Sequence, residues 1–189
     1  GAVVQLARAL RRAFQWREKD LSPAENLNWL RAIAAGLEEV NAAGSGAGPD
    51  FGPVQLFAND RVDFALLARC HLHLTEASIP PECARSIVPA GTLIGRSTHS
   101  LPGARDAERA GADFITFGPV YDTPTKRGYG APPGPEGLRA VCESVSIPVF
   151  ALGGVSVERI GECLQAGARG VALIRAVWDA PDPVAALRR

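Results

Sequence analysis

The sequence lacks an excess of either charge and contains no methionine. Its 189 residues include 20 Lys and Arg against 20 Asp and Glu, and it begins with Gly1. Without a surplus of positive charge, no long-range field favours a nucleic acid or an anionic membrane surface, so both partner classes are excluded. Recognition of a phosphate group must then depend on a local cluster. The missing methionine leads us to expect that the natural amino terminus precedes Gly1.

Metal-finger and disulfide signatures are also lacking. The four cysteines, Cys70, Cys83, Cys142 and Cys163, form no CxxC pair and have no histidine at metal-finger spacing. We therefore expect reduced thiols that fill the core of a cytoplasmic protein. No apolar run is long enough to span a membrane, and the start has no signal-peptide order. With 47% hydrophobic and 21% charged residues, 1–189 is expected to form a single globular domain.

What is present is a regular alternation of short apolar segments and amphipathic segments. Strands are expected at 13–16, 53–58, 71–74, 92–96, 114–117, 147–155 and 170–176, each followed by helical sequence, with a further helix at 2–12. Apolar strands separated by helices predict an α/β fold whose parallel sheet is covered on its faces. No strand is followed by GxGxxG, which argues against a dinucleotide site. One more strand before Gly1 would complete a (β/α)8, or TIM, barrel.

Local signals place several helix ends. Ser22 followed by Pro23 predicts a helix start, and Leu30 marks the buried face of that helix. Ser156 is expected to cap a later helix. Two similar junctions, AGAD at 110–113 and AGAR at 166–169, predict helices that end on glycine and lead directly into strands.

The segment 113–137 is the first candidate for a functional site. It opens as a strand and continues into a long loop rich in glycine and proline, which carries Thr123, Thr125 and Lys126. Loops of this length are usually functional or disordered, and a lysine beside hydroxyl groups suits a phosphate. The alternative, a mobile surface loop with solvated basic residues, stays open on this segment alone.

Polar residues also follow strand after strand, and in a TIM barrel these loops build the active site. They are Arg17, Glu18, Lys19, Asn59, Asp60, Arg61, Thr75, Glu76, Ser78, Ser97, His99, Thr123, Thr125, Lys126, Gly153, Gly154 and Arg175. Each alone is explained as a solvated side chain, but the recurrence favours a site that holds anions. Gly153 and Gly154 would let backbone N–H groups approach a phosphate at a helix start.

His99 is the candidate for proton transfer, because histidine changes charge most readily near neutral pH. A structural hydrogen bond at the strand end explains its position equally well. His71 and His73 alternate within a strand and are expected to be structural. Asp60 and Glu76 are the carboxylates after adjacent strands that could contribute to a Mg²⁺ site together with substrate phosphates.

Six segments in order, FQWREKDLS, FANDRVD, IGRSTHS, FGPVYDTPTKRG, IPVFALGGV and AGARGVALIRAV, resemble the thiamine phosphate synthase and thiazole tautomerase family. The resemblance runs from about Ala13 to Val177 and implies a (β/α)8 barrel whose first strand lies before Gly1. One branch joins a pyrimidine methyl diphosphate to a thiazole phosphate and releases diphosphate with the help of Mg²⁺. The other branch, which needs no metal or other cofactor, moves a proton to aromatise carboxythiazole phosphate.

The synthase pattern assigns diphosphate and pyrimidine contacts to Gln15, Arg17, Lys19, Asn59 and Lys126, and a Mg²⁺ ligand to Asp60. The second Mg²⁺ carboxylate of that branch ends an HxGQxD motif. Residues 73–78 read HLTEAS here, with Ser78 in place of the aspartate. Loss of one carboxylate should cost several kcal/mol of leaving-group stabilisation. Glu76 could replace it only if the backbone is re-aimed.

The tautomerase pattern has Gly-Arg-Ser before a catalytic histidine, which matches Gly95 to Ser97 and His99. We therefore predict a thiazole tautomerase with His99 as general acid and base. The expected substrate-binding residues are Gln15, Arg17, Lys19, Asn59, Ser97, Thr123, Thr125, Lys126, Gly153, Gly154 and Arg175, the last standing where a small hydroxyl residue is usual. The expected ligand is a phosphorylated thiazole. The sequence leaves open whether the protein forms a homodimer. The alternatives are a Mg²⁺-dependent thiamine phosphate synthase and, from another class, a non-catalytic barrel that binds a phosphorylated ligand.

Overall fold

The computed structural model describes residues 13–42, 53–123, 131–182 and 185. Its contacts divide the chain into two compact units. The first unit comprises Gly1–His73, Ile87–Thr92 and Pro181–Arg189, and the second comprises Leu74–Ser86 and Leu93–Ala180. The single domain expected for 1–189 stays a prediction. The expected helix at 2–12, as well as Thr125 and Lys126, lies outside the described residues.

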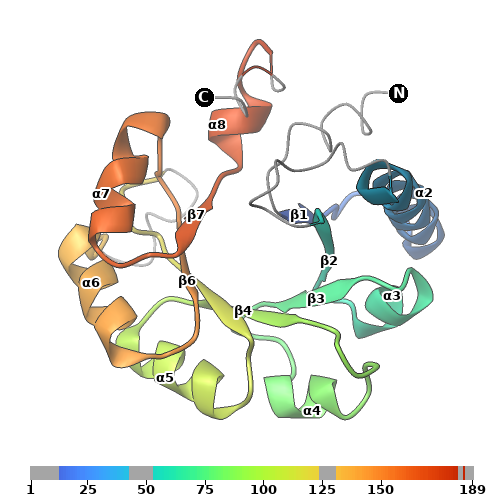
Figure 1. Ribbon diagram of the computed structural model, residues 1–189, viewed down its shortest axis with the longest axis horizontal. Coiled ribbons are helices and arrows are strands. Elements are labelled where there is room, and N and C mark those ends of the chain that lie inside the picture. The colour runs from blue at the N-terminus through green and yellow to red at the C-terminus, as the bar shows by residue number, and fades with distance from the viewer. Residues whose placement is uncertain (1–12, 43–52, 124–130, 183–184, 186–189) are drawn as a thin grey trace. The chain divides into compact units, whose positions relative to one another are not determined.

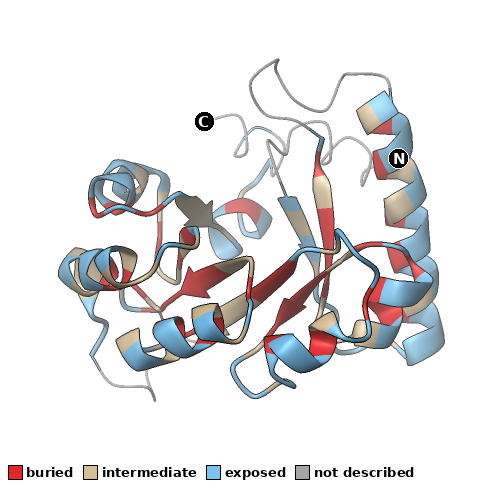
Figure 2. Ribbon diagram, turned by 60° about the horizontal axis from the view of Figure 1, so that its bottom comes forward, coloured by how far each residue is buried: buried red, intermediate tan, exposed pale blue. Residues whose placement is uncertain are grey.

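The first unit is built on three parallel strands in chain order. Its elements are β1 (Ala13–Trp16), α2 (Pro23–Ala42), β2 (Gln55–Asn59), α3 (Val62–Leu67) and β3 (His71–Leu74), whose last residue counts with the second unit. Ala13 is in register with Gln55, and Phe57 is in register with His71. Figure 2 shows one buried stripe along α2, which includes Leu30 as the sequence predicts.

The second unit repeats the same alternation with four parallel strands in chain order. Its elements are α4 (Pro81–Arg85), β4 (Ile94–Thr98), α5 (Leu101–Arg109), β5 (Phe114–Phe117), α6 (Gly134–Ser144), β6 (Val149–Leu152), the 3-10 turn η2 (Val157–Arg159), α7 (Ile160–Gln165), β7 (Gly170–Ala172) and α8 (Arg175–Trp178). Helices α5, α6 and α7 lie along one side of these strands (Figure 1). The predicted α/β fold with parallel strands and intervening helices is confirmed.

Apolar side chains between these helices and strands form the core of the second unit. Ile115 of β5 and Leu138 of α6 are completely buried, and Val149 of β6 is 3% exposed. Burial of each such side chain contributes roughly 1.5–3 kcal/mol to folding. Among the cysteines, Cys70 and Cys163 are buried, whereas Cys83 is exposed, so the expectation that all four fill the core is wrong. In the described residues, no helix combines the length and hydropathy needed to cross a membrane.

Four predicted strands end at other residues than expected: β2 ends at Asn59 instead of 58, and β6 ends at Leu152 instead of 155. In β4 and β7, the neighbouring strand decides where pairing stops. β4 continues through Thr98 instead of ending at Arg96, because Thr98 is in register with Phe117 of β5. β7 ends at Ala172 instead of 176, because its partner β6 ends at Leu152. Ser97 therefore lies within a strand rather than in the following loop, and Arg175 begins α8.

Both AG junctions have the predicted conformation. Gly111 and Gly167 have φ angles of 82° and 99°, in the left-handed region that only glycine adopts readily. These residues end their helices and lead into β5 and β7, respectively.

The start of α2 is stabilised by a reciprocal cap. The backbone N–H of Glu25 donates to Ser22 Oγ at 3.3 Å, and the backbone N–H of Ser22 donates to Glu25 Oε2 at 3.0 Å. The hydrogen bonds from Ser22 also lower the pKa of Glu25. Ser156 holds the same position before η2, but its side chain makes no capping hydrogen bond, so that part of the prediction is wrong.

Replacing Ser22 with alanine is expected to lower the free energy of unfolding by about 1 kcal/mol, because one helix N–H loses its acceptor. Urea unfolding measures the change. Ser156→Ala is the matched control and should change stability by less than about 0.5 kcal/mol. Equal losses in the two variants would show that the Ser22 cap contributes no more to the free energy of unfolding than Ser156 does.

Candidate functional site

The first unit holds a hydrogen-bonded cluster at the ends of its three strands, which we call the glutamine cluster: Gln15, Asn59 and His73. Gln15 Nε2 donates to Asn59 Oδ1 at 2.7 Å and lies 3.2 Å from His73 Nδ1. An amide nitrogen has two hydrogens and no lone pair to offer, so one group can satisfy both acceptors. Gln15 and Asn59, which the sequence assigned to substrate binding, are thereby in direct contact.

His73 belongs to this cluster although the sequence analysis treated it as structural. Its side chain is 4% exposed. Burial lowers the pKa of His73 to about 4, so the neutral ring offers Nδ1 as an acceptor to Gln15. The signal that could have found it is the HxGQxD comparison, in which His73 is the first residue.

The charged residues after β1 and β2 are arranged around two turns of the first unit. Arg17 and Lys19 are exposed, and Glu18 Oε1 accepts hydrogen bonds from the backbone N–H groups of Lys19 and Asp20 at 2.7 and 3.1 Å. Asp60 has a φ angle of 57°, and its N–H donates to the His73 carbonyl at 2.9 Å.

Arg61, in contrast, belongs to the start of α3. It pairs with Asp63, and its guanidinium carbon lies 3.7 Å from the centre of the Phe64 ring.

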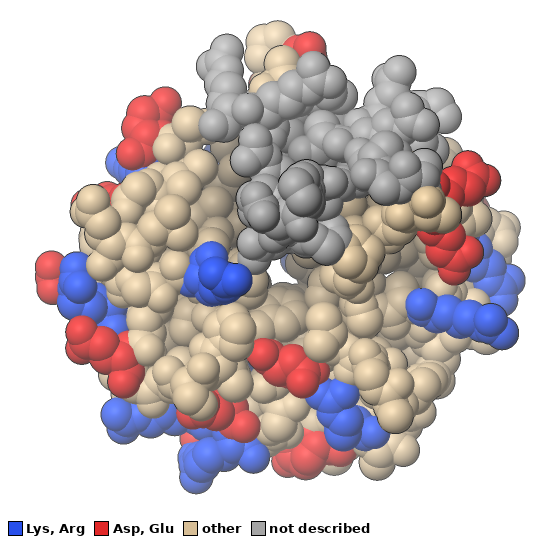
Figure 3. All heavy atoms as spheres, in the orientation of Figure 1, with Lys and Arg blue, Asp and Glu red and all other residues tan. Residues whose placement is uncertain are grey.

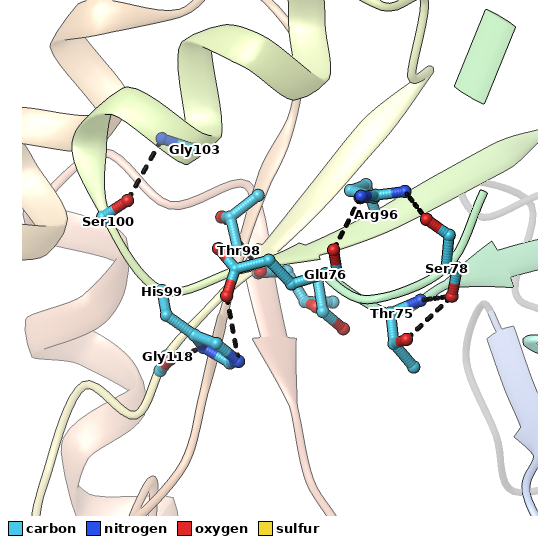
Figure 4. A network of polar contacts seen from close by, with 11 residues as sticks. Thr75, Glu76, Ser78, Arg96, Thr98, His99, Ser100, Gly103 and Gly118 are labelled. Carbon is cyan, nitrogen blue, oxygen red and sulfur yellow. Dashed lines mark hydrogen bonds and ion pairs between the residues drawn. The ribbon is translucent and has the colours of Figure 1, made fainter. Parts of the chain in front are cut away.

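In the second unit, His99 follows β4; the Gly118 carbonyl holds one side of its ring, and the other side faces Glu76. Its Nδ1 donates to the Gly118 carbonyl, and its Nε2 lies 4.0 Å from Glu76 Oε2 (Figure 4). The side chains of His99 and Glu76 are 24% and 48% exposed, so the pair is open to small molecules. Because a carbonyl only accepts, Nδ1 carries the proton in its contact with Gly118.

The loop that carries Glu76 is fixed by Ser78 and Arg96. Ser78 Oγ lies 2.7 Å from both the backbone nitrogen and the hydroxyl of Thr75. Arg96 of β4 donates to the carbonyl oxygen of Glu76 at 2.9 Å (Figure 4). It also donates to the carbonyl oxygen of Ile79 at 2.7 Å. The Ser78 hydroxyl is thus used within its own turn, and Arg96 holds the loop backbone.

Ser97 lies on β4 beside β5, where Thr116 Oγ1 donates to Ser97 Oγ at 3.3 Å. The next residue, Thr98, is 1% exposed and donates to the Thr116 carbonyl at 3.3 Å. The two strands are therefore joined by side-chain as well as backbone hydrogen bonds just before His99.

The loops after β5 and β6 approach each other with almost no room between them. The N–H groups of Val120 and Tyr121 donate to the carbonyls of Leu152 and Gly153 at 2.9 and 3.0 Å. A Cβ on Gly153 would lie 2.7 Å from Pro119, and one on Gly154 would lie 2.7 Å from the Asp122 carbonyl. Gly153 and Gly154 have φ angles of 90° and 67°, so both space and conformation require glycine there.

We call this close approach of the two loops the glycine seam, after Gly118, Gly153 and Gly154. Arg159 of η2 and Tyr121 of the β5 loop support it. Arg159 Nη1 donates to the Gly154 carbonyl at 2.9 Å, and its guanidinium carbon lies 4.4 Å from the centre of the Tyr121 ring. The Tyr121 hydroxyl donates to Glu162 Oε2 at 2.5 Å. Burial and this hydrogen bond raise the pKa of Tyr121.

Thr123 and Arg175 are brought together although 52 residues separate them in the sequence. Arg175 Nη2 donates to Thr123 Oγ1 at 2.7 Å, and Thr123 is 6% exposed. Arg175 itself is exposed at the start of α8. The pair provides a cation and a hydroxyl next to the glycine seam, a combination suited to a phosphate.

Among the described residues visible in Figure 3, basic and acidic side chains are interspersed, and neither charge gathers into a broad patch. Within the described ranges, no three His, Cys, Asp or Glu side chains group closely enough to hold a metal ion. Any anion site in either unit therefore depends on individual side chains and backbone N–H groups.

Comparisons with known proteins match nearly the whole chain. The sequence profile of the family described as thiamine monophosphate synthase matches residues 2–177. A Geobacter sulfurreducens protein provisionally named thiamine-phosphate synthase is 45% identical over 91% of this chain and 76% of its own length. The thiamine-phosphate synthase of Chlorobium phaeobacteroides is 41% identical over 71% of this chain and 66% of its own length.

Solved structures agree with these matches. The thiamine phosphate pyrophosphorylase of Pyrococcus furiosus superposes with a TM-score of 0.84 over 99% of this chain and 84% of its own, at 31% identity. A 3-hexulose-6-phosphate synthase has a TM-score of 0.69 at 20% identity and covers 99% of this chain and 90% of its own, which shows likeness of fold alone.

Proposed function

Because this chain belongs to the thiamine monophosphate synthase family, we propose that it is a thiamine-phosphate synthase. It would join hydroxymethylpyrimidine diphosphate to thiazole phosphate and release diphosphate. The observation that carries the proposal is the glutamine cluster, in which Gln15 and Asn59 lie in hydrogen-bond contact. The sequence analysis ranked the tautomerase first, but the relatives are named for the synthase, and we reverse that order.

In the reaction, the methylene–oxygen bond to the diphosphate breaks, and the thiazole nitrogen forms a new bond to the methylene carbon. The diphosphate leaves with the bonding electron pair, so the protein must stabilise growing negative charge. We assign this role to Arg17 and Lys19 of the first unit. The exposure of Arg17 and Lys19 leaves them accessible to a charged substrate.

The first unit offers one carboxylate for the Mg²⁺ that the family's synthases use. Asp60 directly follows β2 and Asn59, and its backbone is held by a hydrogen bond to His73. Mg²⁺ is commonly held by one or two carboxylates together with substrate phosphates and water, so this donor fits. The bound ion would neutralise diphosphate charge. In the second unit, the Ser78 hydroxyl is used by Thr75, and Glu76 lies beside His99.

The synthase proposal is tested by removing this carboxylate. Asp60→Asn is expected to lower the rate of thiamine phosphate formation by about 100-fold, because neutralisation of the leaving group is weakened. Turnover is followed as diphosphate release from the two substrates with Mg²⁺, and with EDTA it should stop. Asp106→Asn, on an exposed face of α5, is the control and should leave turnover unchanged. Unaltered turnover in Asp60→Asn, or no turnover by the wild type, would contradict the proposal.

A second candidate, the thiazole tautomerase, is favoured by the geometry of His99. The Gly118 carbonyl holds Nδ1, and Nε2 lies 4.0 Å from Glu76 Oε2. We assign the thiazole phosphate to the second unit's anion groups: Ser97, Thr123, Thr125, Gly153, Gly154 and Arg175.

His99→Asn tests this second candidate. The variant is expected to slow conversion of carboxythiazole phosphate by about 100-fold or more, the usual contribution of a general acid or base. Binding of the phosphate, measured by calorimetry, should survive. Full conversion by His99→Asn would remove this residue from the mechanism. Phosphate binding with no turnover in either assay would instead support the non-catalytic barrel.

A further inference from the structure

Asn26 is a buried polar residue near the start of α2 that takes no part in the glutamine cluster. Its side chain is 6% exposed, although asparagine usually lies at the surface. Oδ1 accepts a hydrogen bond from the indole Nε1 of Trp16 at 2.9 Å, and Nδ2 donates to the carbonyls of Leu21 and Ser22 at 3.0 and 3.3 Å. Because an amide has two donor hydrogens and one acceptor oxygen, each polar atom of this buried group has a partner.

These three hydrogen bonds hold the loop between β1 and α2 at both of its ends. Trp16 is the last residue of β1, whereas Leu21 and Ser22 directly precede α2, which begins at Pro23. Hydrogen bonds that are shielded from water are stronger than those at the surface. One amide therefore sets the separation of the two ends of the loop 17–22.

The middle of this loop carries two cations on either side of an acidic residue. Glu18 Oε1 accepts hydrogen bonds from the backbone N–H groups of Lys19 and Asp20 at 2.7 and 3.1 Å, so this carboxylate stabilises the turn. Arg17 and Lys19 are exposed. The loop thus presents two positive charges from a backbone that is held at its ends and within its turn.

We propose that Asn26 is a positioning residue for the substrate that carries a diphosphate. The inference rests on the proposed synthase function, in which Arg17 and Lys19 stabilise the charge of the leaving group. Both cations must stand at the right distance from that charge, and a displacement of about 1 Å can cost about 100-fold in rate. Asn26 is buried, so it acts through the loop and not by direct contact with the substrate.

The test measures the steady-state kinetics of thiamine phosphate formation with each substrate varied in turn. Asn26→Ala is expected to lower kcat/KM for hydroxymethylpyrimidine diphosphate by at least about tenfold, because the loop loses all three hydrogen bonds. KM for thiazole phosphate should change by less than about twofold, because Arg17 and Lys19 serve the other substrate. Asn28→Ala is the matched control: Asn28 is an exposed asparagine of the same helix, and its replacement should leave both parameters unchanged.

Trp16→Phe is a second variant, which keeps an aromatic ring in β1 and removes the indole N–H. The bonds from Asn26 to the Leu21 and Ser22 carbonyls stay in place, so we expect a smaller loss of kcat/KM for the same substrate, about threefold. Thermal unfolding of each variant verifies that it is folded. In ¹H–¹⁵N NMR spectra, the indole signal that is lost in Trp16→Phe should shift in Asn26→Ala. An unshifted signal would contradict the arrangement.

The outcomes separate this inference from the proposed function. Normal kinetics in Asn26→Ala, or equal losses toward both substrates, would overturn the positioning role and leave the synthase standing. Binding of inorganic diphosphate with Mg²⁺, measured by calorimetry, is a readout that needs no turnover. If the wild type forms no thiamine phosphate but binds diphosphate at least about tenfold more tightly than Asn26→Ala does, the synthase fails and the positioning role stands. Equal affinity in the two proteins, or no binding by the wild type, would overturn the positioning role.

Discussion

Replacing Gly118 with alanine is expected to lower the free energy of unfolding by about 3 kcal/mol or more, one of the largest effects in the molecule. The added Cβ would lie 2.1 Å from the Leu152 carbonyl oxygen and 2.8 Å from its carbon, so backbone rather than a flexible side chain must move. Leu152 O also accepts the N–H of Val120 at 2.9 Å, and that bond joins the β5 and β6 loops. Urea unfolding measures the loss.

The same substitution should disturb His99, because the Gly118 carbonyl is its Nδ1 partner. We expect the NMR resonances of the His99 ring to shift. The conversion of carboxythiazole phosphate, the activity of the second candidate function, should also become slower. Gly161→Ala in α7 is the control, since a Cβ there meets nothing within 4 Å. It should raise stability by up to about 1 kcal/mol, because alanine favours a helix over glycine. Similar effects of the two substitutions would show that the close approach at Gly118 is relaxed without cost.

Acidification is expected to destabilise the protein through His73. Burial lowers its folded pKa from 6.5 to about 4, so the unfolded chain binds more protons between these values. Stability is therefore complete above pH 6.5 and is lost as the pH falls toward 4. The loss should be about 2 kcal/mol at pH 5 and about 3 kcal/mol at pH 4. The measurement is urea unfolding at pH 7, 6, 5 and 4.

His73→Asn isolates this effect from other titrating groups. The asparagine side-chain oxygen can still accept from Gln15, but it does not titrate, so the variant should lose less stability than the wild type between pH 7 and 5. Its stability at pH 7 should be lower, because the smaller side chain leaves a space. Parallel curves for the two proteins would mean that His73 does not control the acid response.

The sequence predicts the ends of a strand well where neighbouring residues in the chain determine them. β1, β3 and β5 begin and end at the predicted residues, because turn or charged residues bound short apolar runs. β4 and β7 were misjudged because pairing with a neighbouring strand sets their ends, and that information lies some 20 residues away in the chain. Ser156 shows the same limit, since a capping residue type does not guarantee a capping hydrogen bond.

The candidate site was predictable in residue type but not in contacts. The sequence named Gln15, Asn59, Thr123 and Arg175, which the structure joins in two hydrogen-bonded pairs. It considered Glu76 for a metal, whereas the fold places this carboxylate beside His99. That proximity depends on the hydrogen bond from Arg96 to the Glu76 carbonyl and on the bond from His99 to the Gly118 carbonyl. The spacing of residues in the sequence reveals neither bond.

The glycine seam between the β5 and β6 loops restricts how this protein can be redesigned. Gly118, Gly153 and Gly154 each face backbone of the other loop at distances that exclude any side chain. A β5 loop taken from another enzyme would bring a different backbone path, and the β6 loop would no longer fit against it. The two loops should therefore be transplanted together, as one cassette, in any exchange between family members.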